Sequence, residues 1–195
     1  FNDEIVNFKI KSKNSEINFN KDEHPREGVN LEALSRLKPV FKKQGSITAA
    51  NSSSIADGAA ALVLMRKDDA VAQRLNALAV IKAQVQHAQA PKWFTTAPVG
   101  AIQKVLAKSA WQKEDVDLFE INEAFACVAM AARDELAIDW NKLNISGGAC
   151  ALGHPIGASG ARIVVTLIAA LQRLNKLKGV AALCIGGGEG TAMAV

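Results

Sequence analysis

Two segments of helical length are apolar on almost every side, and they constrain the fold of this chain more than any other feature. In residues 161–174 the apolar side chains share no single stripe, and residues 123–132 have the same character. A helix that is apolar all round must be buried all round, so both segments should lie in an inner layer of a larger structure. Because 195 residues cannot easily bury two such helices alone, we expect partner layers from outside this chain.

The rest of the chain alternates between strand and helix patterns. Downstream, the pattern predicts strands at 79–87, 116–121 and 180–185 with one more after residue 190, and helices at 99–110, 123–136 and 159–174. Upstream, it predicts one or two strands before residue 30, a helix at 31–37, a strand at 59–65 and a helix at 68–75. Such alternation indicates an α/β fold with a mixed sheet, in which a second unit begins near Asn76.

Composition excludes several classes of function. The net charge of +4 and the pI near 9.0 are mildly basic, but aromatic residues make up only 5% and tyrosine is absent, which disfavours nucleic-acid binding. The basic side chains are therefore expected at a solvated surface, with a phosphate-bearing small molecule as the next possibility. The sequence contains no run of 18 apolar residues, so it predicts no membrane-spanning helix. Three cysteines, an odd number without a CxxC pair, favour a reducing compartment over a disulfide framework.

A glycine-rich stretch at 144–160 holds the first candidate for chemistry, His154. Five glycines in seventeen residues allow unusual backbone angles and the close approach of a ligand. We expect Ser159 to cap the following helix, whose N-terminus would favour negative charge. A histidine here can exchange a proton near neutral pH. Taken alone, however, His154 is more readily explained as a structural residue whose ring is satisfied by the backbone.

A second candidate, Cys184, ends an apolar strand and precedes Ile185 and three glycines. The glycines leave backbone N–H groups unshielded, as an oxyanion site requires. A thiol beside such donors and near an imidazole would have a lowered pKa and could move protons. The alternative is a buried thiol that acts as a small apolar side chain. The GGGEG run is not a phosphate loop, because no Lys-Ser/Thr pair follows it.

Three more polar positions have competing interpretations. Asn122 lies at a strand-to-helix junction, where an ordinary helix N-cap explains it equally well. Cys150 precedes His154 by four residues and is a rival nucleophile, but its alanine neighbours favour a small buried residue. Cys127 lies inside an apolar helix and is expected in the core.

Taken together, three of these motifs resemble the C-terminal signatures of the thiolases, the acetyl-CoA acetyltransferases and 3-ketoacyl-CoA thiolases. They are NEAFA at 122–126, GGACALGHPIGASGA at 147–161 and CIGGGEG at 184–190, in the family's order and spacing. Residues 46–65 also resemble an upstream family segment, so the likeness covers the whole chain. It implies a layered α-β-α fold with buried central helices. It also implies a loop domain at 1–55, the end of the N-terminal half at 56–75 and the C-terminal domain at 76–195.

The resemblance implies roles for four residues in forming or cleaving the bond between two acyl groups carried as coenzyme A thioesters. His154 would activate a nucleophilic cysteine, and Cys184 would be the second acid or base. Asn122 would hold a water molecule that, with His154, stabilises the enolate oxygen. The Gly186 N–H would contribute to the other oxyanion hole. The chemistry requires such a set because the α-proton of a thioester is weakly acidic.

Contacts with coenzyme A carry over by position. Arg26, Phe41, Ala49 and Ser53 would hold the nucleotide and pantetheine, and Phe94 and Phe125 would line the acyl end. Many family members have Met-Gly before a second Gly-Pro where this chain has residues 93–98. The bulkier Phe94 in this segment leaves the acyl-chain preference open. Neither a metal nor a cofactor is expected, because the thioesters are themselves the substrates.

The family's nucleophilic cysteine lies upstream of all these motifs, and neither Cys127 nor Cys150 matches it. Because the chain starts at Phe1, we expect it to be part of a longer polypeptide whose N-terminal half is its partner. The whole would be a cytoplasmic homo-oligomer, dimer or tetramer, of fatty acid metabolism, although an organelle is not excluded. The alternatives are a non-catalytic thiolase-like protein that binds acyl-CoA, and a decarboxylating ketoacyl synthase. Cys184 disfavours the synthase, which usually has a second histidine.

Overall fold

The computed structural model, which describes residues 1–13 and 15–195, is built around a four-stranded mixed sheet. The strands are β3 (Ala83–Ala88), β4 (Leu118–Ile121), β5 (Gly179–Cys184) and β6 (Glu189–Ala194), in the order β3-β6-β5-β4. β4 and β5 run parallel, while β6 pairs antiparallel with β5 and with β3. The α/β fold with a mixed sheet is confirmed.

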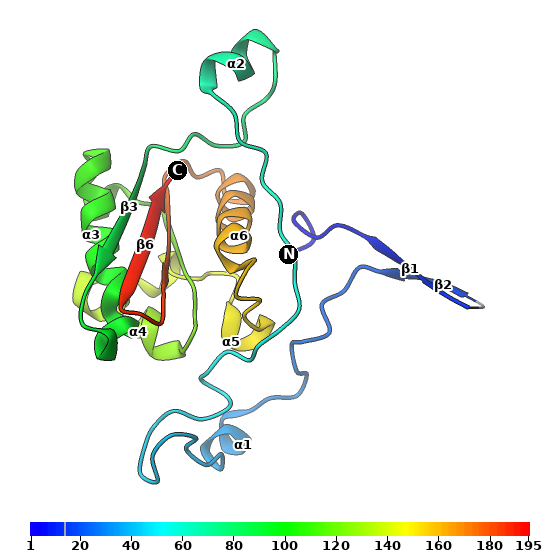
Figure 1. The fold of residues 1–195 in the computed structure, drawn as a ribbon, viewed down its shortest axis with the longest axis vertical. Coiled ribbons are helices and arrows are strands. Elements are labelled where there is room, and N and C mark those ends of the chain that lie inside the picture. Colours follow the sequence, from blue (N-terminus) through cyan, green and yellow to red (C-terminus); the bar gives the residue numbers. More distant parts are fainter. Residues whose placement is uncertain (14) are drawn as a thin grey trace.

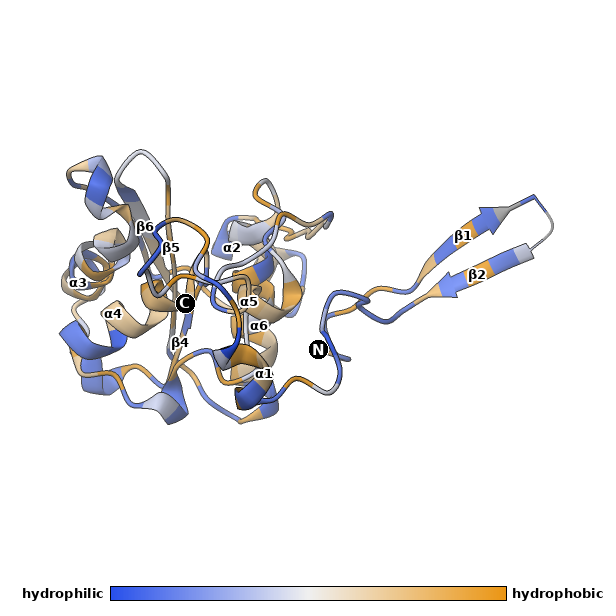
Figure 2. Cartoon of the chain, turned by 90° about the horizontal axis from the view of Figure 1, so that it is seen from below, coloured by the Kyte–Doolittle hydropathy of each residue, from blue (hydrophilic) through white to orange (hydrophobic). Residues whose placement is uncertain are grey.

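Helices cover both faces of this sheet, which makes a three-layered sandwich (Figure 2). α3 (Ala97–Ser109) and α4 (Ala126–Leu136) pack on one face, and α6 (Ser159–Arg173) packs on the other, with α5 (Ala149–Leu152) before it. Successive side chains of a strand point to opposite faces, so the two faces have separate cores. Phe119 belongs to the core under α3 and α4, and Leu118 to the core under α6.

Short single turns connect these elements. They are the 3₁₀ helices η1 (Pro91–Thr96), η2 (Lys113–Asp115) and η3 (Trp140–Lys142). α3 has Pro98 in its first turn, where the missing N–H costs no helical hydrogen bond. α3 and α4 both end on left-handed alanines, Ala110 and Ala137, whose N–H groups bond back to the last turn.

The first 75 residues form an extended arm around the sandwich (Figure 1). Its elements are the antiparallel hairpin of β1 (Phe8–Ser12) and β2 (Ser15–Phe19), then α1 (Leu31–Ser35) and α2 (Lys67–Ala72). Asn30 caps α1 by accepting a hydrogen bond from the Ala33 N–H. The hairpin projects away from the sandwich in both ribbon views, and α2 lies on a separate excursion of the chain.

Some sequence predictions about the elements were wrong. Residues 59–65 form no strand, although they are extended; most of their side chains are exposed because no described strand pairs with them. The strand predicted from residue 79 begins at Ala83, and the helix predicted from residue 123 begins at Ala126. The cap of α6 is Ala158, while Ser159 is the first residue inside the helix.

The prediction of all-round burial is correct for α6 and wrong for α4. Every residue from Ser159 to Leu171 in α6 is buried or half-buried. In α4, by contrast, Met130 is 50% exposed and Cys127 is only half-buried, so the expectation that Cys127 belongs to the core was wrong. Within this chain α4 has one face on the sheet and α3 beside it, and its outer face is open.

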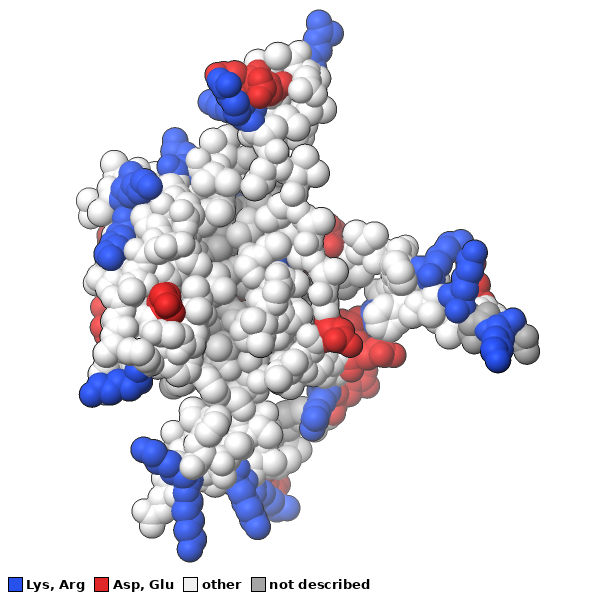
Figure 3. Space-filling view, viewed as in Figure 1, with Lys and Arg blue, Asp and Glu red and all other residues white. Residues whose placement is uncertain are grey.

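Charged side chains gather at the periphery of the face shown in Figure 3. Lysine and arginine lie at the end of the hairpin, around α2 at the top and at the bottom of the view, while the middle of this face is almost uncharged. Among the described residues, no helix is long and apolar enough to cross a membrane.

Candidate functional site

The candidate site lies at the carboxyl edge of the two parallel strands. Asn122 directly follows β4, and its backbone N–H donates to Ala182 O of β5 at 2.9 Å. Cys184 is the last residue of β5. Because β4 and β5 run parallel, their carboxyl ends meet at one edge of the sheet, where α/β proteins usually bind ligands.

Asn122 is a buried residue with its amide aimed at a histidine. The side chain is 1% exposed, and Nδ2 lies 3.4 Å from Nε2 of His154. Its Oδ1 is buried and has no hydrogen-bond partner among the described residues. The helix-cap alternative is excluded, because α4 begins only at Ala126 with Phe125 in the capping position. A buried acceptor without a partner is costly, which is typical of a site that receives a further group.

His154 is held by both its backbone and its ring. Gly153, with φ of +81°, turns the chain into His154, whose N–H donates to Ser54 O at 2.8 Å. Nδ1 lies 2.5 Å from the Ser159 hydroxyl. Burial lowers the pKa of His154, and the nearby Arg162 cation lowers it further, so the ring is neutral at physiological pH. A neutral imidazole that faces Asn122 can accept a proton.

A carboxylate that the sequence analysis did not single out supports the same edge. Glu123 accepts the Cys150 N–H at 3.1 Å and an Asn144 Nδ2 hydrogen at 3.2 Å. The Asn144 amide also bonds both backbone groups of Ile121, at 2.7 and 2.8 Å. A Cβ atom on Gly148 would lie 2.7 Å from the Glu123 carboxyl carbon, so a larger residue here would displace this carboxylate. Adjacency to Asn122 was the one signal in the sequence for Glu123.

Cys184 is a protonated thiol at rest. Burial raises its pKa to about 11, and the exposed fraction of the residue is 6%. The sequence analysis expected a lowered pKa, which was wrong because Cys184 has no hydrogen bond to an imidazole among the described residues and faces the core under α3 and α4. Because burial keeps this thiol protonated, it holds a proton that a strongly basic carbanion can take.

The turn after Cys184 leaves Gly186 exposed. Ile185 N–H donates to Glu189 O at 2.8 Å, and Gly188 N–H donates back to Ile185 O at 3.1 Å, which closes the turn. Gly188 has φ of +106°, an angle that side-chain-bearing residues rarely adopt. Across the described residues, the Gly186 amide makes no hydrogen bond within the chain, as an oxyanion donor requires.

The other two cysteines are poor nucleophiles. Burial and the Glu123 carboxylate raise the pKa of Cys150 to about 12, and burial also raises the pKa of Cys127. Cys150 is half-buried rather than fully buried, so that sequence prediction was only partly right. Neither thiol has the thiolate character that covalent catalysis needs.

Residues 51–58 of the arm cross over the site and attach to both of its sides. On one side, Ala126 N–H donates to Asn51 O at 2.8 Å, and the Ser53 N–H and hydroxyl both donate to Ala124 O. On the other side, residues 54 and 55 pair with His154 as a short parallel bridge. This crossing brings the predicted Ser53 beside the start of α4.

Three of the predicted binding residues form one aromatic group beside this crossing. The Phe125 ring has its centroid 6.1 Å from that of Phe41 and 6.3 Å from that of Phe94, both edge to face. Such pairs are more favourable than their buried area alone implies. Arg26 and Ala49 are exposed, and no hydrogen bond or ion pair of a described residue joins their side chains to this group.

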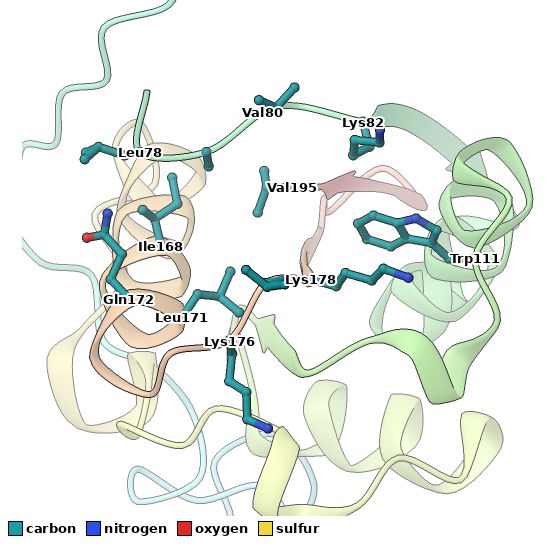
Figure 4. Close-up of a pocket in the computed structure, with 12 residues that line it drawn as sticks. Leu78, Val80, Lys82, Trp111, Ile168, Leu171, Gln172, Lys176, Lys178 and Val195 are labelled. Carbon is teal, nitrogen blue, oxygen red and sulfur yellow. The ribbon is translucent and has the colours of Figure 1, made fainter. Parts of the chain in front are cut away.

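A hollow of about 400 Å³ lies away from the candidate site. It opens at the opposite end of the sheet, between the segment leading into β3, the end of α6 and Trp111 (Figure 4). Lys178 lies over the Trp111 ring with Nζ 5.2 Å from its centroid. The lining of this hollow includes none of the predicted site residues.

Comparison with known proteins gives a consistent result. A family model for the thiolase C-terminal domain matches residues 75–195, and one for the thiolase N-terminal domain matches residues 1–68. The chain is 49% identical to the cytosolic acetyl-CoA acetyltransferase of Rattus norvegicus over 197 residues, which is all of this chain and 50% of the relative.

Solved structures agree. The crystal structure of the Bacillus anthracis acetyl-CoA acetyltransferase superposes with a TM-score of 0.95 at 47% identity, covering 98% of this chain and 49% of that one. Human mitochondrial 3-ketoacyl-CoA thiolase superposes with a TM-score of 0.87 at 36% identity, covering 96% and 48%. The chain thus spans about half the length of the relatives it matches. With the α-β-α layers and the motifs around Asn122, His154 and Cys184 in place, it belongs to the thiolase family.

Proposed function

We propose that the polypeptide containing these residues transfers acyl groups between coenzyme A thioesters. The reaction is the condensation of two acetyl-CoA molecules to acetoacetyl-CoA and CoA, or the reverse thiolysis of a 3-ketoacyl-CoA. The observation that carries the proposal is the contact between the buried Asn122 and the half-buried, neutral His154, beside the strand that ends in Cys184. The relatives named above are acetyl-CoA acetyltransferases and a 3-ketoacyl-CoA thiolase, which supports the same chemistry.

The proposed roles follow from the protonation states. His154 is neutral and accepts the proton of the attacking thiol, which an upstream cysteine is proposed to supply. In thiolysis the Cys184 thiol protonates the carbanion that leaves, as its raised pKa allows, and in condensation the same sulfur takes the α-proton. A water held by Asn122, together with His154, stabilises the enolate oxygen, and the Gly186 N–H binds the other oxyanion.

Substrate binding is assigned to the residues around the crossing segment. Phe94 and Phe125 line the acyl end, and Phe41 extends their aromatic group toward the pantetheine. Ser53, Ala49 and Arg26 follow along the coenzyme A chain toward the nucleotide. The thioester is itself the substrate, and we expect no separate cofactor.

The setting of the enzyme is part of the proposal. The segment at 1–55 acts as a loop domain for coenzyme A, residues 56–75 complete an N-terminal half, and residues 76–195 form the C-terminal domain. The exposed apolar residues of the arm support the view that an N-terminal half covers them. The polypeptide is proposed to work as a cytoplasmic homo-oligomer, dimer or tetramer, in fatty acid metabolism.

The test uses the polypeptide as its gene encodes it, with its intact mass compared with the 20.7 kDa of this chain. His154→Ala should lower the CoA-dependent cleavage of acetoacetyl-CoA by about 10²- to 10⁴-fold, the usual contribution of a positioned general base. His87→Ala is the matched control, because His87 lies on β3 and, among the described residues, its ring bonds Gln89 alone. Near-normal turnover of His154→Ala would refute the proposal. Binding of acetyl-CoA without turnover by the unaltered polypeptide would instead support a non-catalytic binding protein.

A further inference from the structure

The two ring nitrogens of His154 have partners of different character. Nε2 faces the Asn122 amide nitrogen at 3.4 Å, and that nitrogen can only donate. Nδ1 faces the Ser159 hydroxyl at 2.5 Å, which can donate or accept. The tautomer of the neutral ring therefore depends on where the single hydroxyl proton of Ser159 points.

The structure offers that proton an acceptor, the Pro155 carbonyl oxygen, which also accepts the Ala158 and Ser159 N–H groups at 2.8 Å. Ser159 Oγ lies 3.0 Å from the carbonyl oxygen of Pro155, four residues earlier, and a carbonyl cannot donate. With the hydroxyl proton on this bond, the oxygen of Ser159 accepts from Nδ1–H of the ring. The ring then presents a lone pair at Nε2, which is what the donor amide of Asn122 requires.

We infer that Ser159 is the positioning residue of His154, holding the neutral ring as the Nδ1–H tautomer with the free lone pair of Nε2 toward Asn122. The hydrogen-bond chain runs from His154 Nδ1–H to the Ser159 hydroxyl and from that hydroxyl to Pro155 O. A histidine is oriented through the nitrogen that does not react, by the bond that nitrogen makes.

Ser159 suits this role because it is fixed in place. It is 1% exposed and is the first residue of α6. One turn later, Arg162 bonds Glu120 on β4 at 3.3 Å, and Glu120 lies two residues before Asn122, which directly follows that strand. The helix that carries Ser159 and the strand that leads to Asn122 are thus tied together, which fixes both partners of the ring.

The tautomer can be measured on the 195-residue chain without any activity assay. Imidazole ¹⁵N chemical shifts of the histidine-labelled chain distinguish a protonated from an unprotonated ring nitrogen. His24→Asn and His87→Asn variants remove the other two histidine signals and so assign His154. At a pH above the pKa of the His154 ring, Nδ1 should carry the proton. An Nε2–H ring in the unaltered chain would overturn the inference.

Substitution tests the hydroxyl itself. Ser159→Ala should move the neutral ring toward Nε2–H, and Ser159→Thr, which retains the hydroxyl, should restore Nδ1–H. Ser109→Ala is the matched control, because the Ser109 hydroxyl makes the same bond to a carbonyl four residues earlier, in α3 and away from His154. An unchanged ring in a folded Ser159→Ala chain would refute the role. If that variant does not fold, the tautomer of the unaltered chain still decides.

The catalytic consequence rests on the proposed function, but the tautomer does not. In the catalytically competent polypeptide, Ser159→Ala should lower kcat at least tenfold with little change in KM, and should alter the limb of the pH profile that His154 controls. Ser159→Thr should recover most of kcat. The polypeptide could lack thiolysis activity while its His154 ring is still Nδ1–H and still depends on Ser159. That result would overturn the proposed function and leave the positioning role intact.

Discussion

The arm of residues 1–75 and the sandwich of residues 76–195 both contain apolar side chains, but in different environments. Ala70 is the one buried residue among those of the arm whose burial is described, and apolar side chains such as Val63 at 89% and Leu31 at 84% are exposed. In the sandwich the apolar side chains of every strand have a helix to pack on. Apolar composition alone therefore does not make a core; the core needs a second layer within reach.

The largest expected effect compares one leucine from each region. Leu167 in α6 is 1% exposed, and Leu64 in the arm is 71% exposed. Leu167→Ala should lower the free energy of unfolding by about 2–5 kcal/mol, because it removes buried methylene groups and leaves a cavity. Leu64→Ala should change it by about 0.5 kcal/mol or less, as is usual for an exposed site.

Urea denaturation of the 195-residue chain, followed by circular dichroism, measures both variants. A loss for Leu64→Ala as large as that for Leu167→Ala would contradict the comparison, since it would mean that residues 59–65 are packed in solution. The m-value is the internal control, because equal slopes show that both variants unfold from the same compact state.

A smaller effect is expected where the two regions meet. Gly153 has φ of +81°, and a Cβ atom there would lie 2.5 Å from the Cβ of Ala56 in the crossing segment. Gly153→Ala should lower the free energy of unfolding by about 1–3 kcal/mol through backbone strain, and should displace residues 54–56 from His154. Hydrogen exchange at the His154 amide, which bonds Ser54 O, measures that displacement.

Gly157→Ala is the matched control, because Gly157 lies in the same turn and a Cβ atom there would meet nothing within 4 Å. Its effect should stay within about 0.5 kcal/mol. Equal effects of the two substitutions would mean that the crossing segment does not rest on Gly153.

The fold of the sandwich could be predicted from sequence, and that of the arm only in part. Strand and helix patterns in residues 76–195 were correct to within a few residues, because each element packs on a neighbour that belongs to the same chain. The apolar run at 59–65 was predicted to be a strand from its composition and length. These could not show whether a partner strand was present. In the same way, the exposure of Met130 depends on what lies beyond α4.

The residues of the site could be predicted from its motifs, but their protonation states and contacts could be predicted only in part. The family resemblance implied that Asn122 and His154 act together, whereas the residues taken singly left Asn122 as an ordinary helix cap. The protonation state of Cys184 could not be predicted, since a raised pKa comes from burial on the side of α3 and α4, which a linear sequence does not give. Ser159 was predicted to be a helix cap. Its contact with the His154 ring could not be predicted, because that contact depends on how the chain turns at Pro155.

The smallest expected effect compares a glutamate–arginine pair in each region. Glu120 and Arg162 lie 3.3 Å apart at the sheet, with the Glu120 side chain 4% exposed, whereas Glu32 on α1 and Arg36 at its end are 76% and 75% exposed. Burial raises the pKa of Glu120 from 4.5 to about 8, against the opposing effect of Arg162. The folded state therefore prefers the protonated carboxyl. The stability that this preference contributes is complete below pH 4.5 and is lost as the pH rises to about 8.

Glu120→Gln removes this titration and keeps an acceptor for Arg162. Between pH 5 and 8, the free energy of unfolding of the unaltered chain should fall relative to that of the variant by up to about 1.4 kcal/mol per pH unit, the limit for one proton. Glu32→Gln, the matched exposed pair, should cost about 0.5 kcal/mol or less at every pH. Urea titrations at one-unit pH intervals measure both. Parallel curves for the unaltered and Glu120→Gln chains would mean that Glu120 stays ionised beside Arg162, which would make the tie between β4 and α6 a permanent ion pair at neutral pH.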